Sequence, residues 1–133
     1  MNAGFRAPAR PPRILLVDDE PDNLELLAII LAHEGFLPVT ASSGGEALDA
    51  VAKDAPDLVL LDVMMPVMDG FEVLRRLKAD HATRGIPVIM LTAMDQPAAQ
   101  KVARSAGAAD FIGKPLDRAD LCARVRTQLR EKH

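Results

Sequence analysis

Short, mostly apolar runs alternate along the chain with longer segments of mixed polarity. The apolar runs cover residues 14–17, 37–41, 58–61, 86–91 and 109–112. Apolar runs of about four to eight residues bounded by turn residues are typical of buried strands. Each run is followed by a segment with helical spacing. The pattern therefore predicts an α/β fold, a five-stranded, doubly wound parallel sheet with helices on both faces.

The segments between the runs carry helix start and stop signals. Pro21 favours the first turn of a helix and Gly35 favours its end. Ser43 is the expected N-cap of the second helix, and Glu46, three residues later, is expected to complete a capping box. Three further helices are predicted, over residues 70–79, 97–107 and 117–130.

Aspartates stand at the ends of two predicted strands. Asp62 directly follows the run 58–61, while Asp18 and Asp19 follow the run 14–17. Parallel sheets place their ligands outside the carboxyl ends of the strands. Taken singly, each aspartate is equally compatible with a capping role. Together on neighbouring strands they would repel one another by roughly 4 kcal/mol per pair at about 4 Å and an effective dielectric near 20, so they need a cation or protons.

A hydroxyl and an ammonium complete this edge of the predicted sheet. Thr92 follows the run 86–91, and Lys114 lies just beyond the run 109–112. An anion bound at Asp62 would meet a divalent cation, for which Mg²⁺ is the simplest choice with oxygen ligands. It would also meet the Thr92 hydroxyl and the Lys114 charge. These groups predict a phosphoryl site, because phosphoryl transfer depends on positioning and charge neutralisation.

The ordered motifs resemble the receiver domain of bacterial two-component response regulators. The resemblance covers residues 13–130 and includes the flavodoxin-like strand order. It rests on six pieces of sequence: Val17–Glu20, Leu61–Pro66, Met68–Gly70, Leu91–Ala93, Asp110–Phe111 after Gly107–Ala108, and Lys114–Pro115.

The resemblance implies a role for each acidic residue. Asp62 would accept a phosphoryl group from a sensor histidine kinase or a histidine phosphotransfer protein. Asp19, Asp62 and the backbone carbonyl of Met64 would bind Mg²⁺ directly, and Asp18 would act on the metal mainly through water. Mn²⁺ is a possible substitute for Mg²⁺.

The resemblance also implies roles for residues on the last two strands. Thr92 and Lys114 would bind the phosphoryl group, and the bond before Pro115 would be cis. Phe111 stands where many relatives carry a switch tyrosine, although it is also compatible with a simple core position. Residues 97–107, 109–112 and 117–130 would form the output face for a downstream protein or for self-dimerisation.

Two methionines are expected to tune the lifetime of the phosphoaspartate. By resemblance, Met64 and Met94 flank the route of the hydrolytic water, and neither side chain can orient a water molecule by hydrogen bonding. We therefore expect a long-lived phosphoaspartate. The alternative is that both methionines simply fill space, as this flexible side chain often does.

Composition limits the remaining possibilities. The chain has 133 residues, a formal net charge of −3 and a single cysteine, Cys122. We expect a flexible arm rich in Pro, Ala and Arg over residues 1–12 and one receiver domain over residues 13–131. The acidic balance argues against direct nucleic-acid binding. The short apolar stretches argue against membrane insertion, and the lone cysteine suits the cytoplasm.

Three alternatives stay open at this point. The chain could be the N-terminal receiver of a longer effector such as a cyclic-dinucleotide enzyme. It could be a Mg²⁺-dependent aspartyl phosphatase, although that class usually needs a second acid two residues after the nucleophile, where Met64 stands. It could also be a flavin-binding module of the same fold, although aromatic residues make up only 3% of the chain.

Overall fold

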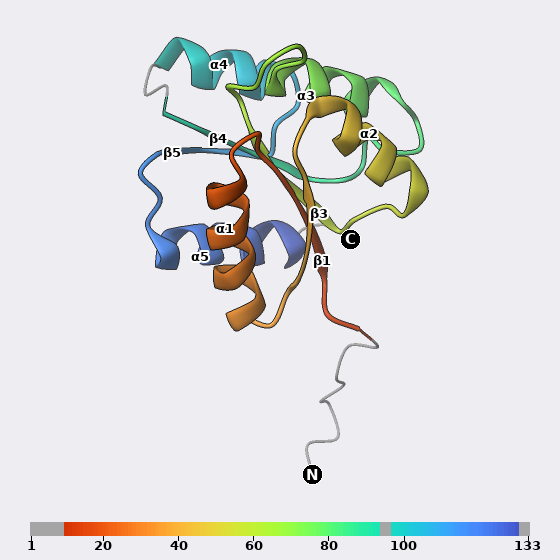
Figure 1. Ribbon diagram of the computed structural model, residues 1–133. Coiled ribbons are helices and arrows are strands. Elements are labelled where there is room, and N and C mark those ends of the chain that lie inside the picture. Colours follow the sequence, from red (N-terminus) through yellow and green to blue (C-terminus); the bar gives the residue numbers. More distant parts are fainter. Residues whose placement is uncertain (1–9, 94–96, 131–133) are drawn as a thin grey trace.

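The computed structural model describes residues 10–93 and 97–130 (Figure 1). Strands and helices alternate as the apolar pattern predicts. Their bounds are β1 Arg13–Val17, α1 Pro21–His33, β2 Leu37–Ala41, α2 Gly44–Lys53, β3 Leu58–Asp62, α3 Gly70–Ala79, β4 Val88–Thr92, α4 Pro97–Ser105, β5 Asp110–Gly113 and α5 Arg118–Arg130.

The five strands form one parallel sheet in the order β2-β1-β3-β4-β5. The predicted doubly wound fold is therefore confirmed. Its register aligns the ends of the strands, because Asp62 on β3 is level with Leu91 on β4, and Thr92 on β4 is level with Gly113 on β5. We call this side of the sheet the carboxyl edge. It consists of the ends of β1, β3, β4 and β5 and the residues that directly follow them.

Helices cover both faces of the sheet. Helices α1 and α5 lie on one side in Figure 1, and α2, α3 and α4 lie on the other. Side chains of β1 alternate between two apolar clusters: Leu15 and Val17 pack with α2, α3 and α4, whereas Ile14 and Leu16 pack with α1 and α5. All five residues of β3 are buried. The unbroken apolar run 58–61 is thus typical of a strand at the centre of a sheet that is covered on both faces.

The N-terminus of α2 departs in one detail from the predicted capping box. Ser43 is the N-cap, and its hydroxyl accepts a hydrogen bond from the Glu46 backbone N–H at 3.1 Å. The Glu46 carboxylate, however, accepts from the backbone N–H of Ser42 at 2.7 Å rather than from that of Ser43. The reciprocal bond therefore reaches one residue further back along the chain.

Ion pairs attach α5 to the rest of the fold. The Glu34 carboxylate, just after α1, accepts hydrogen bonds from Arg118 and Arg126. The guanidinium of Arg126 also lies 5.7 Å from the centre of the Phe36 ring. Between these two arginines, Arg124 pairs with Asp110 of β5 at 2.9 Å. In the described part of the chain, no helix is long and apolar enough to span a bilayer.

The loop between β3 and α3 folds back tightly against the end of β3. The backbone N–H of Gly70 donates to the Val63 carbonyl at 2.9 Å. A Cβ at Gly70 would lie 2.8 Å from the Val63 Cα and closer still to the Asp62 carbonyl oxygen. Only glycine allows this approach. At the top of the loop, Val67 adopts a φ of 68° with a fully exposed side chain.

We predict that Val67→Gly stabilises the protein. A β-branched residue at positive φ carries strain of about 1–3 kcal/mol, while glycine adds an entropic cost of about 0.5–1 kcal/mol. The exposed Val67 side chain has little packing to lose. The expected result is a net gain of about 1 kcal/mol in the free energy of unfolding, measured by urea denaturation. Val67→Ala, which keeps a Cβ at this φ, should gain less. A loss of stability in Val67→Gly would show that the backbone at Val67 is not strained.

Candidate functional site

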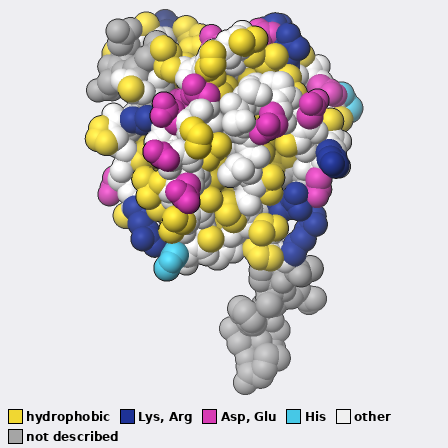
Figure 2. Space-filling model, in the orientation of Figure 1, with side chains coloured by type: hydrophobic (Ala, Val, Ile, Leu, Met, Phe, Trp, Pro, Cys, Tyr) yellow, Lys and Arg dark blue, Asp and Glu magenta, His cyan; other side chains and the backbone are white. Residues whose placement is uncertain are grey.

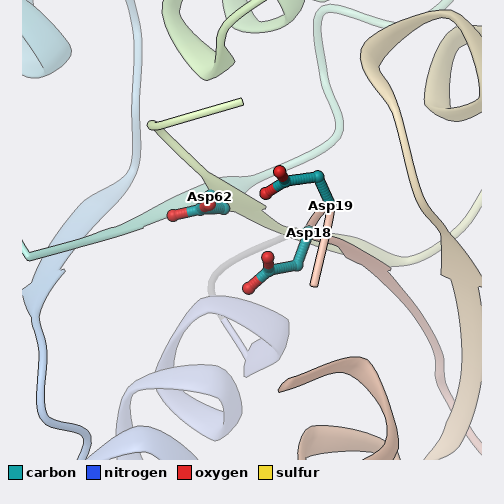
Figure 3. A group of neighbouring side chains, drawn as sticks. All are labelled: Asp18, Asp19 and Asp62. Atoms are coloured by element: carbon teal, nitrogen blue, oxygen red, sulfur yellow. The ribbon is translucent and has the colours of Figure 1, made fainter. Parts of the chain in front are cut away.

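The carboxyl edge brings together the polar residues that the sequence places at the strand ends. Asp62 is the last residue of β3, and Asp18 and Asp19 directly follow β1. Figure 3 shows the three side chains gathered at this edge. One carboxylate oxygen from each residue lies within 4.8 Å of the others. Asp18 and Asp62 are only 1% and 4% exposed, whereas Asp19 is exposed.

This donor set fits a hard divalent cation. Three carboxylates that converge within 4.8 Å offer oxygen ligands and negative charge, and Mg²⁺ prefers both. Two of the three are buried, so water screens their repulsion poorly. Asp19 lies on the solvent side, which leaves a route by which a hydrated ion can enter. The residues present therefore fit a magnesium site.

Lys114 supplies positive charge to the buried pair. Its Nζ lies 3.4 Å from Asp62 Oδ1 and 3.6 Å from Asp18 Oδ2. The backbone positions the lysine, because the Lys114 N–H donates to the Thr92 carbonyl at 2.7 Å. The peptide bond between Lys114 and Pro115 is cis. A single ammonium thus lies between two carboxylates and neutralises only part of their charge.

Asp18 is held by donors that come from the start of α1. Its Oδ1 accepts the backbone N–H of Glu20 at 3.0 Å, and its Oδ2 accepts the side-chain amide of Asn23 at 3.2 Å. Sequence reasoning missed Asn23. Its position in the sequence could have indicated this contact. Asn23 lies on the first turn of α1, just after the two aspartates, and side chains on a helix point back toward the preceding residues.

Burial raises the pKa of the Asp62 carboxyl above its ordinary value, and the nearby charge of Asp18 raises it further. The Lys114 ammonium and a backbone hydrogen bond from Met64 act in the opposite direction without cancelling the effect of burial. The ionised form of Asp62 is therefore held in an unfavourable setting. A bound cation would relieve this cost.

The remaining residues singled out in the sequence differ in their burial. Thr92 is fully buried at the end of β4, and Phe111 is 5% exposed within the apolar cluster under α2, α3 and α4. Met64 lies on the rim, with 60% of its surface exposed. Met94 lies outside the described residues. Cys122 is buried in α5, within the apolar cluster that packs against α1.

The five-stranded parallel sheet with an acidic cluster and a lysine at its carboxyl edge is the arrangement of a signalling receiver domain. The chain belongs to the response regulator receiver domain family, whose model matches residues 14–126. The predicted family is therefore confirmed. This membership removes the flavin-binding alternative and identifies the protein as a signalling switch domain of two-component systems.

Named relatives agree with this assignment. Response regulator PleD of Caulobacter vibrioides is 48% identical to this chain. The match covers 90% of this chain and 26% of PleD. The DNA-binding response regulator MtrA of Mycolicibacterium smegmatis is 45% identical over 89% of this chain and 50% of MtrA. The chain thus spans between a quarter and a half of these relatives.

A solved structure shows the same architecture. The crystal structure of a putative response regulator from Chloroflexus aurantiacus superposes with a TM-score of 0.87. The two sequences are 34% identical, and the match covers 91% of this chain and 99% of that one.

We predict that Asp62→Asn stabilises the metal-free protein. The change removes a buried charge that lies beside Asp18 and has an unfavourably raised pKa. We expect a gain on the order of 1 kcal/mol in the free energy of unfolding, measured by urea denaturation at pH 7 with EDTA. The matched control is Asp69→Asn, at the exposed N-cap of α3, where asparagine caps equally well. Mg²⁺ should stabilise the wild type more than Asp62→Asn. A less stable Asp62→Asn would show that the Asp62 charge is not unfavourable in the metal-free protein.

Proposed function

We propose that Asp62 accepts a phosphoryl group in a Mg²⁺-dependent reaction from a sensor histidine kinase or a histidine phosphotransfer protein. The observation that carries this proposal is the convergence of three carboxylates and one ammonium at a single sheet edge. In the transfer, an Asp62 carboxylate oxygen forms a bond to phosphorus while the phosphorus–nitrogen bond to the donor imidazole breaks. The imidazole leaves with the bonding electron pair.

The ligands for Mg²⁺ in this proposal are the carboxylates of Asp18, Asp19 and Asp62 and the backbone carbonyl of Met64. Asp18 would act mainly through water, and Mn²⁺ would serve in place of Mg²⁺. When bound, the metal supplies positive charge against the phosphoryl oxygens. The convergent carboxylate oxygens support this assignment.

The residues around Asp62 divide the remaining work. Lys114, already 3.4 Å from Asp62 Oδ1, would pair with a phosphoryl oxygen. The Thr92 hydroxyl, at the end of the adjacent strand, would donate a hydrogen bond to another. The buried setting of Asp62 and Thr92 would limit access of water to the acyl phosphate.

Phosphorylation would switch the surface formed by α4, β5 and α5. Movement of Thr92 toward the phosphoryl group would change the space beside Phe111, which lies on the neighbouring strand β5. The Arg124–Asp110 pair joins α5 to β5, so a shift in β5 would reach the helix. A downstream protein or a second copy of the chain would bind this face. A shift from 1:99 to 99:1 requires about 5.5 kcal/mol of preference for the active state.

The wider assignments follow from the same proposal. We place the protein in the cytoplasm, with residues 1–12 as an arm, residues 13–131 as the receiver domain and no direct contact with nucleic acid. A receiver within a longer effector would use the same chemistry, and the partial coverage of the relatives is compatible with that arrangement. A turnover phosphatase is disfavoured, because Met64 cannot act as a general acid.

Intact-mass spectrometry tests the phosphoacceptor. Incubation with acetyl phosphate and Mg²⁺ should add one phosphoryl group to the wild type and to Asp69→Asn, and none to Asp62→Asn. EDTA should abolish the addition. Asp69→Asn removes one negative charge from the loop after β3, as Asp62→Asn removes one from its end. The comparison therefore distinguishes the need for the Asp62 carboxylate from an effect of net charge. An adduct on Asp62→Asn, or one independent of Mg²⁺, would contradict the proposal.

A second prediction concerns the lifetime of the phosphoaspartate. Met64 lies on the exposed rim, two residues after Asp62, and offers no strong hydrogen bond to a water molecule. Met64→Asn adds such a group. One hydrogen bond worth about 1 kcal/mol in the hydrolytic transition state corresponds to a rate increase of about fivefold. Phosphorylated protein, freed of donor and followed by mass spectrometry, should therefore lose its phosphoryl group faster. Met64→Leu should behave as wild type, and an unchanged rate in Met64→Asn would rule out this role.

A further inference from the structure

Both carboxylate oxygens of Asp18 accept hydrogen bonds from the N-terminal end of α1. Oδ1 accepts the backbone N–H of Glu20, and Oδ2 accepts the side-chain amide of Asn23 at 3.2 Å. A carboxylate can only accept hydrogen bonds, so the amide nitrogen of Asn23, and not its oxygen, must face Asp18. Asp18 is 1% exposed, and water therefore offers little replacement for this bond.

Asn23 shares its acceptor with Lys114. The ammonium of Lys114 lies 3.6 Å from the same Oδ2 of Asp18 and 3.4 Å from Asp62 Oδ1. Without the Asn23 amide, Oδ2 would have the ammonium as its only described side-chain partner and would draw it away from Asp62. The Asp18 carboxylate would also be held less firmly, by its bond to Glu20 and by the ammonium alone. Both changes would disturb the oxygen cluster.

We propose that Asn23 is a positioning residue for the metal and phosphoryl site. It fixes the plane of the Asp18 carboxylate and keeps Lys114 shared between Asp18 and Asp62. The inference rests on the proposed function and deepens it, because it adds to that site a residue that contacts neither the metal nor the phosphoryl group. Groups that orient a metal-binding carboxylate typically alter metal affinity by 10- to 100-fold when removed.

The surroundings of Asn23 allow its amide to be removed without loss of shape. Asn23 lies at one end of a groove of about 300 Å³ between α1 and α5. Most of the groove is apolar, and its lining includes Leu26, Ile30 and Leu116. Leucine is close in shape to asparagine, so Asn23→Leu should be accommodated there while it deletes the donor.

The experiment measures the Mg²⁺ dissociation constant of the full chain by isothermal titration calorimetry. Asn23→Leu should weaken Mg²⁺ binding 10- to 100-fold, and Asn23→Gln, which keeps an amide, should recover at least part of the loss. Leu26→Ala, in the same groove but with an apolar side chain that cannot hydrogen-bond Asp18, is the matched control and should bind as wild type. Melting temperatures of all four proteins without metal report any loss of folding.

A kinetic readout separates positioning from a general structural role. With acetyl phosphate as donor, Asn23→Leu should need 10- to 100-fold more Mg²⁺ for half-maximal phosphorylation yet approach the wild-type rate at saturation, because bound metal then holds Asp18 in place.

Three results would overturn the inference. The first is an Asn23→Leu affinity within twofold of wild type. The second is an equal loss of affinity in Leu26→Ala. The third is a lower saturating rate that tracks a lower melting temperature. Failure of the wild type itself to bind Mg²⁺ would instead remove the proposed function on which the inference rests.

Discussion

Electrostatic repulsion between carboxylates at the carboxyl edge is the constraint on which the rest of this structure depends. Asp18 and Asp62 are almost completely buried, and Asp19 completes a cluster with oxygens within 4.8 Å of one another. Such proximity is unfavourable without positive charge. Lys114 offsets part of it. The negative charge that Lys114 leaves uncompensated favours binding of a divalent cation. The electrostatic repulsion in the metal-free protein would thus contribute to its affinity for the cation.

The order of the strands in the sheet brings these carboxylates together. Strands β1 and β3 are neighbours at its centre, so the residues at their ends must meet. Their apolar side chains pack against helices on both faces, which anchors the acidic ends in a rigid setting. The tight return of the next loop, possible only because Gly70 has no side chain, keeps the backbone close to Asp62. Packing energy from the core therefore holds like charges together.

Sequence alone predicted the parts that follow from periodicity and ordered motifs. Five apolar runs sufficed for the parallel sheet, and strand ends sufficed to locate Asp62 and Lys114. What escaped prediction depends on side-chain direction and loop geometry. The hydrogen bond from Asn23 to Asp18 requires knowing how the first turn of α1 faces the site. Glu46 reaching Ser42 depends on local backbone angles. The positive φ of Val67 opposes the preference of valine, so no propensity argument could find it.

The most direct test of the central claim is to locate the phosphoryl group chemically. Reduction of the phosphorylated protein with borohydride converts an aspartyl phosphate to homoserine, and peptide mapping then identifies the position. We expect homoserine at position 62 alone. Asp18 and Asp19 should remain unmodified, because their proposed role is to bind the metal and not to attack phosphorus. Homoserine at either of those positions, or at Asp69, would contradict the assignment of Asp62 as the acceptor.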